Sequence, residues 1–213
     1  DFFVPLLQFN TNIMEASRVN GVKRFLYTSS IAVLNPGTDK YPSMAKLMGE
    51  YQIEAYRIQY PEFGNHCCVV RPANVYGRYD NFKNPFSMVV TSLIRKALTE
   101  NEINVWGDGS EKREFIHARD VAKGMLMSME QMPSKPVNLG SGEVHTISYL
   151  AEILSNLSGK KLVYLTAEKR GGSVRTVIED ASQADIGFKA EICLEDGVKE
   201  SYEYAKNVFF NEA

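Results

Sequence analysis

The sequence contains little cysteine, no long apolar run and almost no net charge. Three cysteines in 213 residues are too few, and odd in number, for a disulfide framework, so a reducing, cytoplasmic location is expected. No apolar run approaches the ~20 residues of a membrane helix, which excludes a bilayer span. A net charge of −2 gives no bulk attraction to nucleic acid or to anionic membranes.

Histidines and glycines also lack the patterns that indicate a bound metal or nucleotide. His66, His117 and His145 are scattered, without carboxylate or thiol neighbours at ligand spacing, so no metal site is predicted. The chain has no G-x-x-G-x-x-G anywhere. The pairs Gly107–Gly109 and Gly140–Gly142 lack a third glycine and are typical of plain turns.

Short apolar, β-prone runs alternate with helical patterns along the chain. Strands are predicted at 25–28, 67–71, 103–106, 114–117, 137–139 and 162–165. Helices are predicted at 1–20, 42–59, 88–98, 121–131, 146–157 and 194–207, with loops at 35–39 and 72–85. Continuous apolar strands that alternate with helices are typical of a parallel α/β sheet that is buried on both faces.

Several motifs occur in a fixed order. They are Tyr27–Val33, Ala45–Glu50, Arg71–Gly77, Trp106–Ser110, Arg113–Ala122 and Asn138–Glu143. Together they cover nearly the whole chain and resemble the extended short-chain dehydrogenase/reductases that act on nucleotide sugars, the NAD-dependent epimerase/dehydratase family. Within that family, Asn74–Phe82 is most similar to the GDP-fucose synthases and their relatives.

The resemblance implies a Rossmann-type parallel sheet and a smaller α/β substrate-binding lobe. Family members open with a strand and a Gly-rich turn that holds the dinucleotide pyrophosphate at a helix N-terminus. Because this chain lacks that turn, we expect the sheet to lack its first strands, and the fragment to bind NAD or NADP poorly and to be inactive by itself. Residues 1–72, with return segments near 103–130, are expected to form the remainder of the dinucleotide-binding domain. Residues 73–213 are expected to form mainly the substrate lobe, interleaved with it.

The family's catalytic pattern is a strand-end Ser or Thr, a Tyr, and a Lys four residues after that Tyr. Ser30 matches the hydroxyl and Lys46 matches the lysine, but Pro42 stands four residues before Lys46 and Tyr41 five. Residues at i and i+5 lie ~140° apart around a helix. Either Pro42 starts the helix and Tyr41 is a cap residue whose phenol folds back, or the proton-transfer residue is absent and the protein is a weakened or inactive member. The interval between Ser30 and Lys46 is short for the family, and the sequence alone does not decide whether residues are absent between Gly37 and Thr38.

Binding residues are carried over from the same motifs. The resemblance implies cofactor contacts at Ser29, Ser30, Tyr41, Lys46, Pro72 and Val75. It implies substrate contacts at Asn74, Met88, Arg95, Trp106, Arg113 and Arg175. Arginine suits a diphosphate because its planar fork pairs two oxygens at once. For Arg95 and Arg175 a solvated surface position is an equally good interpretation.

Residue differences narrow the reaction that the resemblance implies. Dehydratases follow the strand-end hydroxyl with an Asp-Glu pair, where this chain has Ile31-Ala32, and fucose synthases use a Cys and a His, where it has Ala32 and Met88. What remains is oxidation or reduction at one sugar carbon, as in a 4-epimerase or a ketosugar reductase. The alternatives are a non-catalytic nucleotide-sugar-binding relative and a reductase of other carbonyl compounds. The first helix, with Phe2, Phe3 and Phe9, is a predicted homodimer surface.

Overall fold

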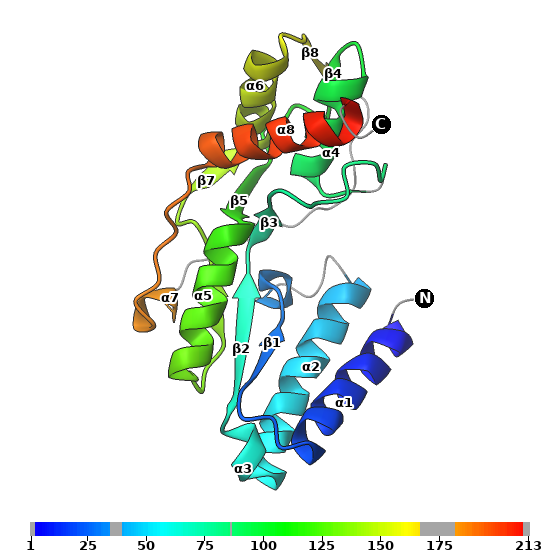
Figure 1. The fold of residues 1–213 in the computed structure, drawn as a ribbon. Helices are drawn as coiled ribbons and strands as arrows, with labels where there is room; N and C mark the ends of the chain where they lie inside the picture. Colours follow the sequence, from blue (N-terminus) through cyan, green and yellow to red (C-terminus); the bar gives the residue numbers. More distant parts are fainter. Residues whose placement is uncertain (1–2, 35–39, 86, 167–181, 211–213) are drawn as a thin grey trace. The chain divides into compact units, whose positions relative to one another are not determined.

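The chain folds into two compact units of alternating helices and strands (Figure 1). The computed structural model describes residues 3–34, 40–85, 87–166 and 182–210, apart from the side chains of Lys40 and Tyr41. The helices are α1 (Phe3–Val19), the 3-10 helix η1 (Ile31–Leu34), α2 (Lys40–Gln59), α3 (Pro61–Gly64), α4 (Val89–Thr99), α5 (Ala118–Gln131), α6 (Ile147–Ser158), α7 (Ser182–Asp185) and α8 (Leu194–Phe210). The strands are β1 (Phe25–Thr28), β2 (Cys67–Pro72), β3 (Asn74–Tyr76), β4 (Ile103–Trp106), β5 (Lys112–His117), β6 (Val137–Leu139), β7 (Val144–Thr146) and β8 (Leu162–Leu165).

The first unit contains a parallel sheet with the strand order β1-β2-β6. It is built from residues 1–73, 121–140 and 176–189. Figure 1 shows α1 and α2 on one side of β1 and β2, and α5 on the other. Strand β2 is buried along almost its whole length, as an apolar strand covered on both faces should be. One apolar core cluster of this unit joins Met14, Tyr27, Ile53, Phe63, Cys67 and Val69.

The second unit comprises residues 74–120, 141–175 and 190–213. Strand β5 pairs with β3 in parallel and with β7 in antiparallel orientation, and β4 pairs with β8 in parallel. Helices α4, α6 and α8 pack on one another around a core that includes Leu93, Ile94, Leu150, Leu154 and Val198. No helix in the described parts of either unit is long and apolar enough to span a membrane.

The predicted α/β class is confirmed, and the differences lie in the shortest elements and at helix starts. Strand β3 occupies part of the loop predicted at 72–85, and the four-residue helices α3 and α7 were not predicted. Three or four residues carry too little periodicity for a sequence signal. Residues 35–39, where a loop was predicted, lie outside the described residues. Residues 103–120, expected to return to the first unit, pack in the second, whereas 121–140 pack in the first.

Two cysteines confirm the interpretation of the 67–71 run as a buried strand. Cys67 and Cys68 are at most 1% exposed. Burial raises the pKa of the Cys67 thiol to about 12 and that of Cys68 to about 11, because the interior disfavours the thiolate. Both are therefore inert packing groups, whereas Cys193 is exposed.

Candidate active site

The carboxyl end of β1 carries two adjacent serines with different surroundings. Ser29 is buried, and its hydroxyl donates to the Glu50 carboxylate. Ser30 is half-buried, and its Oγ accepts the backbone N–H of Ala32 at 3.2 Å, so that it caps η1. Of the two predicted hydroxyls, Ser29 therefore faces the interior of the unit and Ser30 is the one nearer to solvent.

Lys46 lies beside this strand end. Its Nζ donates to the carbonyl oxygen of Thr28 at 2.7 Å and lies 5.4 Å from the centroid of the Tyr27 ring. Tyr27 also donates its hydroxyl to the backbone carbonyl of Lys46 at 3.2 Å, and accepts from Asn10 on α1 at 3.1 Å. Burial lowers the pKa of Lys46 and raises that of Tyr27 to about 12. The structure thus brings the predicted Lys46 to the end of the predicted serine strand.

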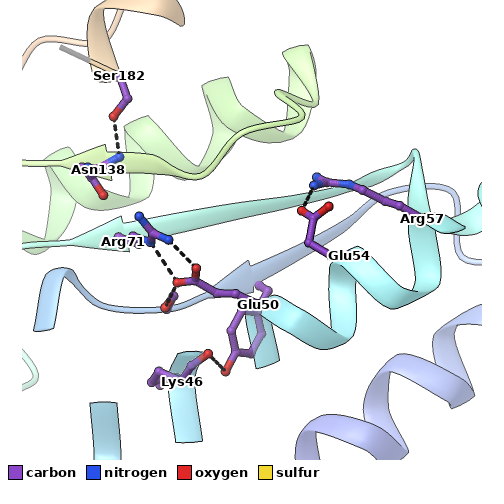
Figure 2. Close-up of polar contacts among 9 residues, drawn as sticks. Lys46, Glu50, Glu54, Arg57, Arg71, Asn138 and Ser182 are labelled. Atoms are coloured by element: carbon purple, nitrogen blue, oxygen red, sulfur yellow. Dashed lines mark hydrogen bonds and ion pairs between the residues drawn. The ribbon is translucent and has the colours of Figure 1, made fainter. Parts of the chain in front are cut away.

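A buried ion pair stands one helical turn after Lys46 (Figure 2). Arg71, on β2, donates to the Glu50 carboxylate from Nε at 2.9 Å and from Nη2 at 2.5 Å, and the same carboxylate accepts from Ser29. This two-point geometry is the strong form of an arginine–carboxylate pair. Glu50 was not among the predicted site residues, although its four-residue spacing from Lys46 places both on one face of α2.

Tyr41, the predicted proton-transfer residue, lies inside helix α2 and not before its start. Helix α2 begins at Lys40, so the interpretation in which Pro42 starts the helix and Tyr41 caps it is wrong. Pro42 is tolerated because the first four N–H groups of a helix have no partner within it. Tyr41 is therefore in the first turn, five residues before Lys46, and its side chain lies outside what is described. Pro72, a predicted cofactor contact, is buried at the end of β2, opposite Leu139 on β6.

In the second unit, two predicted residues lie on β3, and a third precedes α4. Asn74 begins that strand and donates its side-chain amide to the backbone oxygen of Glu114 at 2.8 Å. Val75 is opposite Ile116 on β5. Met88 precedes α4, and 60% of it is exposed.

Trp106 ends β4, and 45% of it is exposed. Lys96, on α4, lies beside it: its Nζ donates to the backbone oxygen of Asn104 at 2.6 Å and is 6.0 Å from the Trp106 ring centroid. Only 8% of Lys96 is exposed. A lysine is rarely so buried without a specific partner. Lys96 was not among the predicted site residues. The signal that could have found it is a lysine on the buried face of the amphipathic helix α4.

The three predicted arginines have different positions. Arg113, on β5, is mostly buried and pairs with Glu111 at 2.6 Å. Arg95, on α4, lies 3.5 Å from a Glu100 oxygen, and its buried Nε has no hydrogen-bond acceptor among the described residues. Arg175 lies outside the described residues, so its predicted substrate contact stays a prediction.

Known proteins match almost the whole chain. Residues 1–140 match the NAD dependent epimerase/dehydratase family. A putative GDP-L-fucose synthase from Arabidopsis thaliana is 33% identical over 235 residues, covering 98% of this chain and 70% of that protein. The crystal structure of a GDP-6-OMe-4-keto-L-xylo-heptose reductase from C. jejuni has a TM-score of 0.83 at 23% identity, over 98% of this chain and 77% of that one. A GDP-mannoheptose C4 reductase from Campylobacter jejuni with NADP bound has a TM-score of 0.78 at 25% identity, over 97% of this chain and 75% of that one. The chain belongs to the NAD dependent epimerase/dehydratase family.

Proposed function

We propose that the chain is an NAD(P)-dependent nucleotide-sugar epimerase or ketosugar reductase that acts at one sugar carbon. The observation that carries the proposal is the position of the Lys46 ammonium group, which lies 2.7 Å from the last carbonyl oxygen of β1, that of Thr28, two residues before Ser30. Ligands of open α/β sheets bind at the carboxyl ends of the strands. The relatives that match are GDP-fucose synthases and nucleotide-sugar reductases or epimerases, which supports this class.

The groups at the end of β1 fit the nicotinamide end of the cofactor. Lys46 offers ammonium donors, and Ser30 offers a hydroxyl, which suit the hydroxyls of a ribose. NAD or NADP, when bound, supplies the hydride donor or acceptor. The 213 residues contain no three-glycine turn for the pyrophosphate, which supports weak cofactor binding by this polypeptide.

The proton chemistry falls to Ser30, Tyr41 and Lys46. In this proposal Lys46 holds the ribose, and its positive charge assists proton transfer by Tyr41. Tyr41 exchanges a proton with the sugar hydroxyl or ketone, and Ser30 donates a hydrogen bond to the same oxygen. The partial burial of Lys46 strengthens its electrostatic effect, since water screens it less.

The second unit carries the groups that suit a nucleoside diphosphate. Arg113 and Lys96 offer positive charge, Trp106 offers an exposed ring, and Asn74 an amide near the start of β3. Guanidinium and ammonium groups bind phosphate oxygens by charge-assisted hydrogen bonds. Ala32 and Met88 stand where the resemblance places the Cys and His of the fucose synthases. This difference supports a reaction at one sugar carbon, without epimerisation at the carbons on either side of it.

Helices α1 and α2 support a homodimer. They expose a set of apolar side chains: Val4, Phe9, Ile13, Met44, Met48 and Tyr51. A shallow depression lined by Leu7, Met48 and Tyr51, among others, lies between the two helices. Contiguous exposed apolar surface of this kind marks interaction sites. We propose that a second copy of the chain covers it.

A second candidate function is that of a non-catalytic nucleotide-sugar-binding protein. The five-residue spacing of Tyr41 and Lys46 favours it, because both lie in α2 and an ideal helix separates them by ~140° around its axis. Both candidates require the second unit to bind a nucleoside diphosphate. They differ in whether hydride transfer follows.

Calorimetric titration with GDP, UDP and dTDP tests the substrate class. We expect binding of at least one diphosphate and weaker binding of the matching monophosphate, because the cationic groups would lose one phosphate partner. A reductase of other carbonyl compounds would bind none of them. No heat with any diphosphate would overturn the proposed function in both of its forms.

A further inference from the structure

Glu50 is the most enclosed carboxylate at the end of the first sheet, and three hydrogen bonds end on it. Only 6% of the residue is exposed. It accepts two bonds from Arg71 and one from Ser29. A buried charge is stable only when it is paired and hydrogen-bonded, and this carboxylate satisfies both conditions.

The three partners of this network come from three different elements. Ser29 follows β1, and its backbone N–H donates to Val70 of β2 at 2.8 Å. Arg71 belongs to β2 and is opposite Asn138 of β6. Glu50 belongs to α2. The carboxylate therefore fastens α2 to the carboxyl ends of β1 and β2, which is the edge where Ser30 lies.

Tyr27, on β1, holds both the backbone and the side chain of Lys46. The hydroxyl of Tyr27 binds the Lys46 backbone oxygen, and its ring lies under the ammonium group. Glu50 is one turn further along the same face of α2. Tyr27 and Glu50 thus tie α2 to β1 at two points, and between them the Lys46 ammonium reaches the Thr28 carbonyl.

We propose that Glu50 is a positioning residue: through Ser29 and Arg71 it fixes α2 against the strand ends, so that Lys46 stays at the Thr28 carbonyl beside Ser30. This rests on the proposed function for Lys46. In this proposal Glu50 acts only through Ser29 and Arg71. Its role is to keep the lysine side chain in one place before any ligand binds, which reduces the conformational entropy lost on binding.

Glu54 provides a matched control on the same helix. It also pairs with an arginine, Arg57, but 55% of its side chain is exposed, and the pair lies within α2 (Figure 2). Arg57 is mostly buried and donates to the carbonyl oxygen of Cys67 at 2.8 Å, at the start of β2 and away from the strand ends near Ser30. Glu54 itself bonds to no strand, and an ion pair with one exposed partner contributes little. Glu54→Gln removes the same charge from the same helix without touching the strand ends.

The first test follows the titration of Lys46 by NMR, with lysine carrying carbon-13 at Cε and the signal assigned by Lys46→Arg. In the wild-type chain, Lys46 is expected to titrate below the exposed lysines, because it is partly buried. In Glu50→Gln we expect its midpoint to rise to that of the exposed lysines, since the freed side chain returns to water. Glu54→Gln should leave the midpoint unchanged.

The direction of the change separates positioning from simple electrostatics. If Lys46 stayed in place and only lost a nearby negative charge, its midpoint would fall. A fall, or no change, would overturn the proposal. Arg71→Lys keeps the charges of residues 50 and 71 but removes the two-point hydrogen bonding of the arginine. It is the replacement variant if Glu50→Gln does not fold. It is expected to raise the midpoint as well, and an unchanged midpoint in a folded Arg71→Lys chain would overturn the proposal equally.

A second measurement keeps this proposal distinguishable from the proposed function. Single-turnover hydride transfer should slow at least tenfold in Glu50→Gln while GDP affinity stays the same, because the substitution disturbs Lys46 and not the second unit. An equal rate in Glu50→Gln and wild type would overturn the positioning role. If the wild type transfers no hydride while cofactor and sugar nucleotide are both bound, the catalytic function fails, and the Lys46 titration still decides whether Glu50 positions the lysine.

Discussion

The hydroxyl of Tyr27 donates to the backbone carbonyl of Lys46 and occupies the space that a side chain on Gly49 would need. A Cβ at residue 49 would overlap the phenol, and Tyr27 is only 6% exposed, so it has little room to move. The glycine is thus required where α2 approaches β1. This contact sets the distance between the helix that carries Lys46 and the strand that precedes Ser30.

Gly49→Ala is therefore expected to destabilise the fold. Overpacking costs about 1–3 kcal/mol, and the better helix propensity of alanine offsets roughly 1 kcal/mol, so a net loss of up to about 2 kcal/mol is predicted. Denaturant unfolding measures it. In the double variant with Tyr27→Phe, part of the overlap is relieved, so the loss should be smaller than the sum of the single losses. Strict additivity would show that the two residues do not collide.

Arg113→Gln is expected to weaken GDP binding. A hydrogen bond to a charged group is worth about 1.5–3 kcal/mol, which corresponds to a Kd raised roughly 10- to 150-fold. Calorimetry measures the change. Arg119→Gln is the control, since Arg119 is exposed and pairs with Glu200. Equal affinity of wild type and Arg113→Gln would remove Arg113 from the diphosphate site.

Tyr41→Phe tests the proton-transfer step. Loss of a positioned general acid–base group lowers a rate by about 10²–10⁴-fold, so hydride transfer should slow by at least 100-fold while GDP affinity is kept. Single-turnover kinetics with each variant give both quantities. A rate equal to that of wild type would mean that another group, or water, moves the proton.

Thiol reactivity reports the environment of the cysteines. Because burial raises the pKa values of Cys67 and Cys68 to about 12 and about 11, both stay protonated at mildly alkaline pH. Iodoacetamide should then modify about one thiol per native chain, Cys193, and all three after unfolding. Peptide mass spectrometry identifies the site. Modification of Cys67 or Cys68 in the native chain would contradict their burial.

The exposed face of α1 and α2 is expected to mediate self-association. Tyr51→Glu introduces a charge into that face and should shift the chain from dimer to monomer in analytical ultracentrifugation. The control is Leu126→Glu on α5, an exposed apolar residue outside that face. A dimer that persists in Tyr51→Glu, or a wild-type monomer, would contradict the proposed interface.

The parts of this molecule that the sequence predicted are those with a strong local pattern. Apolar strands such as Cys67–Pro72 and the amphipathic helix Val89–Thr99 were predicted to within about one residue, because burial imposes their periodicity. Lys46 and Ser30 came from motif resemblance, and the structure places them at one strand end.

Other features depend on contacts between residues far apart in the chain. The Glu50–Arg71 pair joins residues that are 21 positions apart, and no local sequence pattern predicts it. Lys96 was missed because its burial depends on β4 and Trp106. The start of α2 was predicted at Pro42, since proline favours a first helical position, yet the helix begins two residues earlier.

In the proposed function, Lys46 serves hydride transfer to or from a nucleotide sugar. Single-turnover fluorescence of reduced nicotinamide, with protein in excess to offset weak cofactor binding, tests it most directly. With a nucleoside-diphosphate 4-ketosugar, the fluorescence should decay in the wild type and persist in Lys46→Met, while both bind GDP equally. Equal decay in both, or no decay in a wild type to which both the sugar nucleotide and the reduced nicotinamide are bound, would show that Lys46 does not serve hydride transfer.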